Sequence, residues 1–371
     1  MLSRLRSIRH RMAAGILLHG HECAIEARER FAYGADMHAI EQVIQNSLPL
    51  AVVALIVAFV VLAKCAAFFV DSSVEIANKL KIPRLVIGLV LVSFATTSPE
   101  LAVSLMSAVQ DRPEIAFGNA IGSVICDDGL ALALCGILAP TVIAVHPGVL
   151  KSSGVFLAIV SVLVFLFVAF DGTPTLTRVE GLVLIGVFVA YLSYLYRQHK
   201  AGKMEEDATL EDIDHDRRSM GKDVALFLAG LVGIIIASHF IILSAEKIAL
   251  AFGVPKSIVA LVLVAFGTSV PEVATCVTAA LKGEGALAVG NILGADIMNI
   301  CWVAGASAIA NDLVMGRKEI GFMFPWMFVI VGTMLALLRW KHNWSRRKGL
   351  AMLALYIAYV VSMLVCFPPG S

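Results

Sequence analysis

LVLVSFATTSPELA (residues 89–102) recurs as LVLVAFGTSVPEVA (residues 261–274), and this repetition decides the fold. When residues 88–128 are placed over 260–300, a constant shift of 172, no gap is needed and 15 of 41 positions are identical. Apolar segments can share composition by chance, but a Pro-Glu pair and a later Gly-Asn pair do not recur at one offset by chance. The chain therefore contains an internal repeat.

The composition around these copies is that of a membrane protein. The chain has 371 residues, of which 59% are hydrophobic and 15% charged. Soluble domains average about 25% charged residues. Residues 155–170 carry no charge and 48–70 carry only Lys64, and runs of about 20 apolar residues match the bilayer core. The lipid bilayer is thus the expected surrounding, and a net charge of +1 gives no indication of a nucleic-acid partner.

Apolar blocks between short loops predict an all-α polytopic protein with about ten transmembrane helices, five in each copy of the repeat. An odd number of helices returns the chain to the opposite side of the membrane, so the two copies should have inverted topology. Many secondary transporters are built in this way and bind substrate near the midplane. The predicted helices are 48–70, 84–109, 115–138, 154–170, 179–197, 224–244, 256–281, 286–310, 321–340 and 349–366.

Four regions follow from this reading: a basic N-terminal segment of no assigned role (1–47), a first five-helix repeat (48–197), a charged linker (198–223) and a second repeat (224–366). Translation from Met37 instead of Met1 would remove most of the first segment. The loops on the linker's side of the membrane are richer in Lys and Arg, which predicts that the linker is cytoplasmic. The expected location is a prokaryotic inner (plasma) membrane with multiple passes.

Two glutamates, Glu100 and Glu272, occupy matching positions in apolar segments with no Lys or Arg nearby as a partner. An ionised carboxylate at that depth costs several kcal/mol unless it is paired or coordinated. A proline precedes each glutamate and frees a backbone carbonyl, and oxygen atoms lie in the same turns. The hydroxyl residues of these turns are Thr96, Thr97 and Ser98 in the first copy and Thr268 and Ser269 in the second. Carboxylate, carbonyl and hydroxyl oxygens are the ligands of calcium and also suit sodium.

The next helix of each copy contains a second match, GNAIGSVICD (118–127) over GNILGADIMN (290–299). Its GxxxG spacing predicts close packing of helices. Asp127 is a third carboxylate in an apolar helix, and Asn299 is its neutral counterpart. Asp128 and Asp296 lie off the matched pair and can face a water-filled path, a neighbouring helix or an ion. Asn119 and Asn291 can either bridge helices or contact an ion.

These paired motifs resemble the α-repeats of the cation/calcium exchanger superfamily, and most of all the prokaryotic sodium/calcium exchangers. The resemblance implies that Glu100 and Glu272 are the metal (calcium) ligands. It further implies an ion-binding set for Ca²⁺ and Na⁺ that includes Thr96, Thr97, Ser123, Asp127, Thr268, Ser269 and Asn299. It also implies that the first helix of each half acts as a sliding gate. Two departures stand out: Asp127 and Asn299 are exchanged relative to the family, and Ala295 replaces a serine.

The resemblance implies a secondary active antiporter that exchanges Ca²⁺ for Na⁺ by alternating access, with no cofactor beside the transported ions. A proton/calcium exchanger remains an alternative, since a carboxylate can also carry a proton, and a cation channel is a more distant one. An enzyme is not expected, because no HExxH, GxSxG or P-loop motif is present. His239 lies in an apolar segment, where a structural role is expected.

Overall fold

The computed structural model describes residues 41–42, 44–80, 82, 84–169, 174–200, 219–252 and 266–367. The elements of the first repeat are α3 (Leu48–Leu80), α4 (Arg84–Ile87), η1 (Gly88–Val92), α5 (Ser93–Thr96), α6 (Ser98–Val109), α7 (Pro113–Cys126), η2 (Asp127–Ala131), α8 (Leu132–Leu138), β1 (Ile143–Ala144), α9 (Pro147–Val149), η3 (Leu150–Gly154), α10 (Val155–Ala169), β2 (Thr175–Leu176) and α11 (Arg178–Lys200). The second repeat has α12 (Met220–Ala251), α14 (Val270–Leu281), α15 (Gly285–Met298), η4 (Asn299–Val303), α16 (Ala304–Ala310), β3 (Leu313–Val314), α17 (Arg317–Arg339), η5 (Trp340–His342), β4 (Asn343–Trp344) and α18 (Arg346–Cys366).

Among these described residues, eight helices are long and apolar enough to cross a membrane. The eight are Leu48–Leu80, Pro113–Leu138, Pro147–Ala169, Arg178–Gln198, Met220–Ile248, Gly285–Ala310, Arg317–His342 and Arg346–Cys366. The predicted helix 84–109 is wrong as a single rod, because Gly88–Thr96 and Ser98–Val109 meet at a 50° bend. The predicted helix 256–281 is described only from residue 266 onward, so its first part lies outside the described residues.

The predicted and observed helix boundaries differ most where a helix continues through polar residues. The first predicted helix stops at residue 70, whereas α3 runs to Leu80 through Asp71, Glu75 and Lys79. Hydropathy measures the apolar run, and a helix can extend beyond it while its side chains reach the interface. The linker is likewise shorter than predicted, since α11 includes residues 198–200 and α12 begins at Met220.

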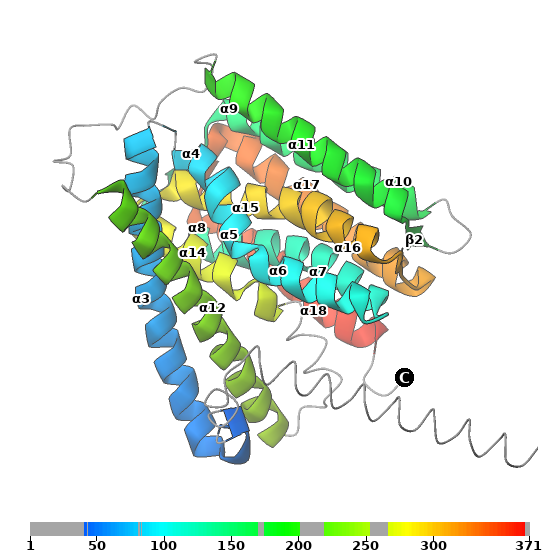
Figure 1. The fold of residues 1–371 in the computed structure, drawn as a ribbon, viewed down its shortest axis with the longest axis horizontal. Helices are drawn as coiled ribbons and strands as arrows, with labels where there is room; N and C mark the ends of the chain where they lie inside the picture. Colours follow the sequence, from blue (N-terminus) through cyan, green and yellow to red (C-terminus); the bar gives the residue numbers. More distant parts are fainter. Residues whose placement is uncertain are drawn as a thin grey trace, which may run out of the picture.

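The first helices of the two repeats, α3 and α12, lie side by side and run at a steep angle to most of the other helices (Figure 1). Near the start of α3, Gln45 donates to the carbonyl of Leu243 (3.4 Å), whereas at its end Lys79 pairs with the fully buried Asp223. The start of one helix therefore meets the later part of the other. Equivalent helices that run antiparallel are what inverted repeats require.

Cross-repeat packing is reciprocal. α6 of the first repeat packs on α16 of the second, and α14 of the second packs on α8 of the first. The fifth helices follow the same rule, because α11 packs on α16 and α18 on α8. Two short antiparallel pairs repeat it again: β1 pairs with β4 and β2 with β3. Each contact between the repeats therefore occurs twice, once with each repeat supplying the equivalent element. The chain is an all-α polytopic membrane protein with two interlocked inverted halves.

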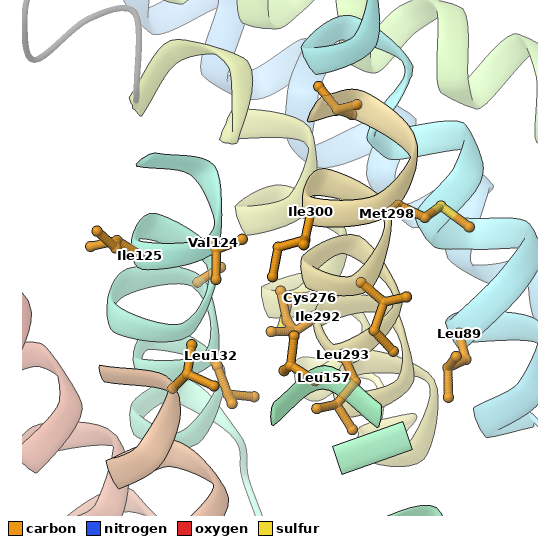
Figure 2. Close-up of a cluster of buried hydrophobic side chains, with 14 of the residues drawn as sticks. Leu89, Val124, Ile125, Leu132, Leu157, Cys276, Ile292, Leu293, Met298 and Ile300 are labelled. Atoms are coloured by element: carbon orange, nitrogen blue, oxygen red, sulfur yellow. The ribbon is translucent and has the colours of Figure 1, made fainter. Parts of the chain in front are cut away.

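The helices that carry Asp127 and Asn299 form the centre of the molecule. In the most apolar 18-residue stretches of Pro113–Leu138 and Gly285–Ala310, 78% and 83% of the residues are buried. In the corresponding stretch of α3, 22% are buried. Figure 2 shows apolar side chains around this centre, with Ile292 and Leu293 of α15 close to Leu157 of α10 and Cys276 of α14. The polar groups of these two helices are therefore enclosed by protein, and the outer helices present apolar side chains outward.

The close packing predicted from the GxxxG spacing is confirmed at Gly294 but not at Gly118. A Cβ on Gly294 would lie 2.3 Å from the carbonyl oxygen of Leu89 and 2.5 Å from the hydroxyl of Ser93. A Cβ on Gly118 would meet only the terminal methyl of Met315, at 4.0 Å. Only the former glycine is needed for one repeat to approach the other.

We expect Gly294→Ala to destabilise the protein by about 1–3 kcal/mol, the usual magnitude for an overpacked site. Gly118→Ala is the matched control on the equivalent helix, and its better helix propensity (about 1 kcal/mol) should leave stability unchanged or slightly higher. Melting temperatures of the purified variants in detergent measure both effects. Equal melting temperatures for the two variants would contradict the close approach at Gly294.

Candidate ion-binding site

Each glutamate begins a half-helix rather than lying in the middle of a continuous one. α6 begins at Ser98 and α14 at Val270, so Pro99 and Pro271 occupy the first turns, where a missing N–H is tolerated. Glu100 and Glu272 are in the same first turns. The N-terminus of a helix carries a partial positive charge that stabilises a carboxylate. Broken helices of this kind are where transporters bind ions at membrane depth.

Hydroxyl groups reach the glutamates from the opposite repeat. The Thr97 hydroxyl donates to Oε1 of Glu272 over 3.3 Å, and Thr96 lies against the same carboxylate. In the reciprocal arrangement, Thr268 faces Glu100. All of these side chains are at least 92% buried, since Thr268, the most exposed of them, is 8% exposed. The polar centre is therefore shared between the repeats, and neither copy could form it alone.

Asn119 and Asn291 complete a symmetric set of hydrogen bonds between the repeats, as the bridging role expected from the sequence requires. Thr96 donates to Oδ1 of Asn291 (3.3 Å), and Thr268 donates to Oδ1 of Asn119 (3.1 Å). Thr96 and Asn119 of the first repeat correspond to Thr268 and Asn291 of the second at the shift of 172, so the two bonds are equivalent with the repeats exchanged. Asn119 also donates to the carbonyl of Glu100 (3.3 Å) and so fixes the turn that carries this glutamate.

Asp127 and Asn299 meet each other directly. The amide of Asn299 donates to Oδ2 of Asp127 over 3.3 Å, and both side chains are fully buried. Their separation of 172 residues is the repeat shift itself, so this contact lies where the two halves face their own counterparts. Both residues begin π-helices, η2 and η4. Such π-helical turns are rare and are frequent at functional sites.

Several oxygen atoms of this centre have no hydrogen-bond donor in the described part of the chain. They include both carboxylate oxygens of Glu100, Oε2 of Glu272, Oδ1 of Asp127, Oδ1 of Asn299 and the hydroxyls of Ser123 and Ser269. Buried polar atoms normally have partners, so an unpartnered set this large leaves room for a bound ligand or ordered water. Ser269 nevertheless faces Asp127. The hydroxyl of Ser98 does not belong to the set, because it bonds to the carbonyl of Phe94 on an exposed face.

No basic side chain in the described part of the chain neutralises these carboxylates. Lys348 is the only buried Lys or Arg among those residues. Its ammonium group is held instead by the carbonyl oxygens of Leu337, Trp340 and Asn343 and by the side chain of Asn343. Three or more His, Cys, Asp or Glu side chains in metal-binding geometry are also not found among them. The centre mixes carboxylates with neutral oxygens, a set suited to a cation that is bound and released.

His239, predicted to be structural, lies in the second half of α12 and pairs with Glu41 at 2.8 Å. This contact is far in sequence from every residue of the site. It also ties residues just before α3 to the second repeat. The rest of the N-terminal segment, residues 1–40, lies outside the described residues.

The fold and this enclosed oxygen-lined centre define a polytopic membrane transporter of the exchanger type, not an enzyme. Comparison with known proteins gives the family: residues 50–197 and 222–365 match the model of the sodium/calcium exchanger protein family, and the chain belongs to it. The membership establishes cation/calcium exchange as its class of activity.

The chain is also similar to individual relatives over nearly their whole length. The sodium/calcium exchanger MaX1 of Methanosarcina acetivorans is 28% identical over 83% of this chain and 96% of its own. The inner membrane protein YrbG of Escherichia coli is 30% identical over 82% and 93%. A solved structure of the sodium-calcium exchanger NCX_Mj superposes with a TM-score of 0.71 at 26% identity, covering 85% of this chain and 100% of that one.

We expect Thr97→Val to weaken calcium binding, because it removes a hydroxyl that contacts Glu272 while keeping the side chain's shape. The expected loss is about tenfold in half-saturating calcium, corresponding to about 1.4 kcal/mol. Ser98→Ala, in the neighbouring position but facing away, is the matched control and should leave this value unchanged. Calcium titration of transport in proteoliposomes distinguishes the two. Similar effects for both variants would show that the turn, and not the hydroxyl, matters.

Proposed function

We propose that the chain is a secondary active antiporter that exchanges Ca²⁺ for Na⁺ across a prokaryotic inner membrane by alternating access. Its ions bind between the two repeats, near the membrane midplane. The observation that carries this proposal is the pair of fully buried glutamates, Glu100 and Glu272, each facing hydroxyls of the other repeat and neither neutralised by a basic side chain in the described part.

Glu100 and Glu272 act as the calcium ligands in this proposal. Both carboxylate oxygens of Glu100 and Oε2 of Glu272 have no hydrogen-bond donor in the described part of the chain. Carboxylates on opposite repeats can contact one ion from both sides. The surrounding oxygen-bearing residues are those predicted from sequence: Thr96, Thr97, Ser123, Asp127, Thr268, Ser269 and Asn299. Ca²⁺ takes six to eight oxygens, which two glutamates, hydroxyls and freed carbonyls can supply together.

Coupling follows from charge. Glu100, Glu272 and Asp127 carry three negative charges when ionised, in an interior where bare charge is unstable. Either calcium or several sodium ions can compensate them, and both compete for the same oxygens. The centre is then stable only when loaded, so rearrangement of the loaded protein is favoured over that of the empty one. Exchange, rather than leakage, is the expected outcome.

The α3–α12 pair is the proposed moving gate. It is set apart from most of the other helices (Figure 1) and meets them mainly through α14, with a smaller contact to α4. Lys282, just after α14, donates to Asp71 of α3 (2.5 Å). The glutamate half-helix α14 is therefore linked directly to the gate. Movement of α3 can in this way be transmitted to the turn that holds Glu272.

The decisive experiment is calcium-45 uptake into proteoliposomes loaded with sodium, potassium or choline at fixed pH. Uptake should require outward sodium. Glu100→Gln or Glu272→Gln should reduce it by about a hundredfold or more, since calcium affinity depends on ligand charge. Glu114→Gln changes an exposed glutamate in the first turn of α7 and is the matched control.

Uptake that ignores sodium but follows a pH gradient would replace this proposal with proton/calcium exchange. The same buried carboxylates could then carry protons. Calcium flux with no counter-ion requirement would instead indicate a channel. In both cases the glutamate variants should still lose activity relative to Glu114→Gln, so the site and the coupling ion are tested separately.

The linker 198–223 is proposed to be cytoplasmic, on the basis of the positive-inside rule. We expect a cysteine placed by Ala208→Cys to react with a membrane-impermeant maleimide only after spheroplasts of a bacterial host are broken. A cysteine from Gly172→Cys, in the loop after the fourth predicted helix, should react in intact spheroplasts. The reverse pattern would invert the orientation of the whole chain.

A further inference from the structure

Two further aspartates, Asp128 and Asp296, stand outside the repeat symmetry. The repeat counterpart of Asp128 is Ile300, and that of Asp296 is Val124. Each half has therefore gained one acid where its counterpart has an aliphatic side chain. Neither residue belongs to the set of ion ligands predicted above. Packing between the repeats does not require an acid at either position, because the counterpart in the other copy is an apolar residue.

The fold brings these two aspartates together. Asp128 lies in η2 and Asp296 in α15, two elements that pack against each other. Both side chains are fully buried, and the hydrogen bond from Asn299 to Asp127 (3.3 Å) holds the two segments together directly beside them. The pair adjoins the centre already described, since Asp128 follows Asp127 and Asp296 is one helical turn before Asn299.

All four oxygens of this pair lack a donor in the described part of the chain. The charged groups that face the pair are also acidic: Asp127 faces both of its members, and Glu272 faces Asp296. Two facing carboxylates repel each other in a low-dielectric interior. A structural pair could share one proton, but this would satisfy only the two oxygens that face each other, and the described part of the chain offers no donor to the other two. A positive ligand is what the arrangement lacks.

We propose that Asp128 and Asp296 hold a second cation position beside the Glu100–Glu272 centre, suited to a hard cation from the transported pool, Na⁺ or Ca²⁺. The inference rests on the proposed function, because the same ions supply both positions. Only oxygen atoms are offered, which excludes soft metals. The free Oδ1 atoms of Asp127 and Asn299 are the next oxygens that such an ion could share with the central site.

Equilibrium binding of calcium-45 and sodium-22 to the purified full-length chain tests this position. The combined variant Asp128→Asn with Asp296→Asn keeps shape and removes charge. It should bind about one cation fewer per chain than the unmodified protein, for whichever ion occupies the position. Glu100→Gln should lose binding at the central site and keep the additional ion. Ser307→Ala, a buried hydroxyl without a partner in α16, is the control for a change in the interior.

Folding is checked by the melting temperature without ions. The double variant should be as stable as the unmodified chain or more stable, because a repulsive pair has been removed, while the rise in melting temperature on adding the bound ion should be smaller. An unchanged ion count would overturn the inference. Proton release on ion binding from this pair, with no change in ion count, would overturn it too. If the unmodified chain binds neither ion, the proposed function fails first.

Discussion

Three buried carboxyl groups without a basic partner in the described part of the chain impose the strongest constraint on this fold. Glu100, Glu272 and Asp127 are fully enclosed, and Lys348, the one buried basic residue in the described part, is committed to backbone oxygens. A soluble protein would neutralise such groups with Lys or Arg. In the proposed function, a transported cation supplies the neutralising charge. The broken helices and the hydroxyl-bearing turns hold the carboxylate oxygens where such a cation could reach them.

The reciprocal construction explains how an apolar interior can contain so polar a centre. Each repeat supplies hydroxyls to the glutamate of the other, and each asparagine bridge, Thr96 to Asn291 and Thr268 to Asn119, crosses between them. The amide oxygens of both asparagines are thereby satisfied within the protein. The same exchange appears at the periphery, in the β1–β4 and β2–β3 pairs. The site therefore exists only where the two halves are in contact.

Much of this could be predicted from the sequence, because repetition and charge in apolar segments are visible there. The shift of 172 identifies Glu100 with Glu272 and Asp127 with Asn299. The sequence does not show which hydroxyls face inward: Thr97 reaches Glu272 whereas Ser98 turns outward, because the bend at Thr97 reorients the helix that follows. The sequence also does not predict that Asp128 lies near Asp296, because their proximity depends on how η2 packs against α15. The continuation of α3 to Leu80 was missed because polar residues end a hydropathy signal without ending a helix.

The contact between the repeat counterparts Asp127 and Asn299 has an energetic consequence. In a carrier with two identical inverted halves, the conformation open to one side would be related by two-fold symmetry to the conformation open to the other side. The two conformations would then have equal free energy. An aspartate opposite an asparagine is one of the differences that remove this equality, because one side chain can ionise and its counterpart cannot. Under the proposed alternating access, the carrier would therefore favour one of its two conformations before any ion gradient acts on it.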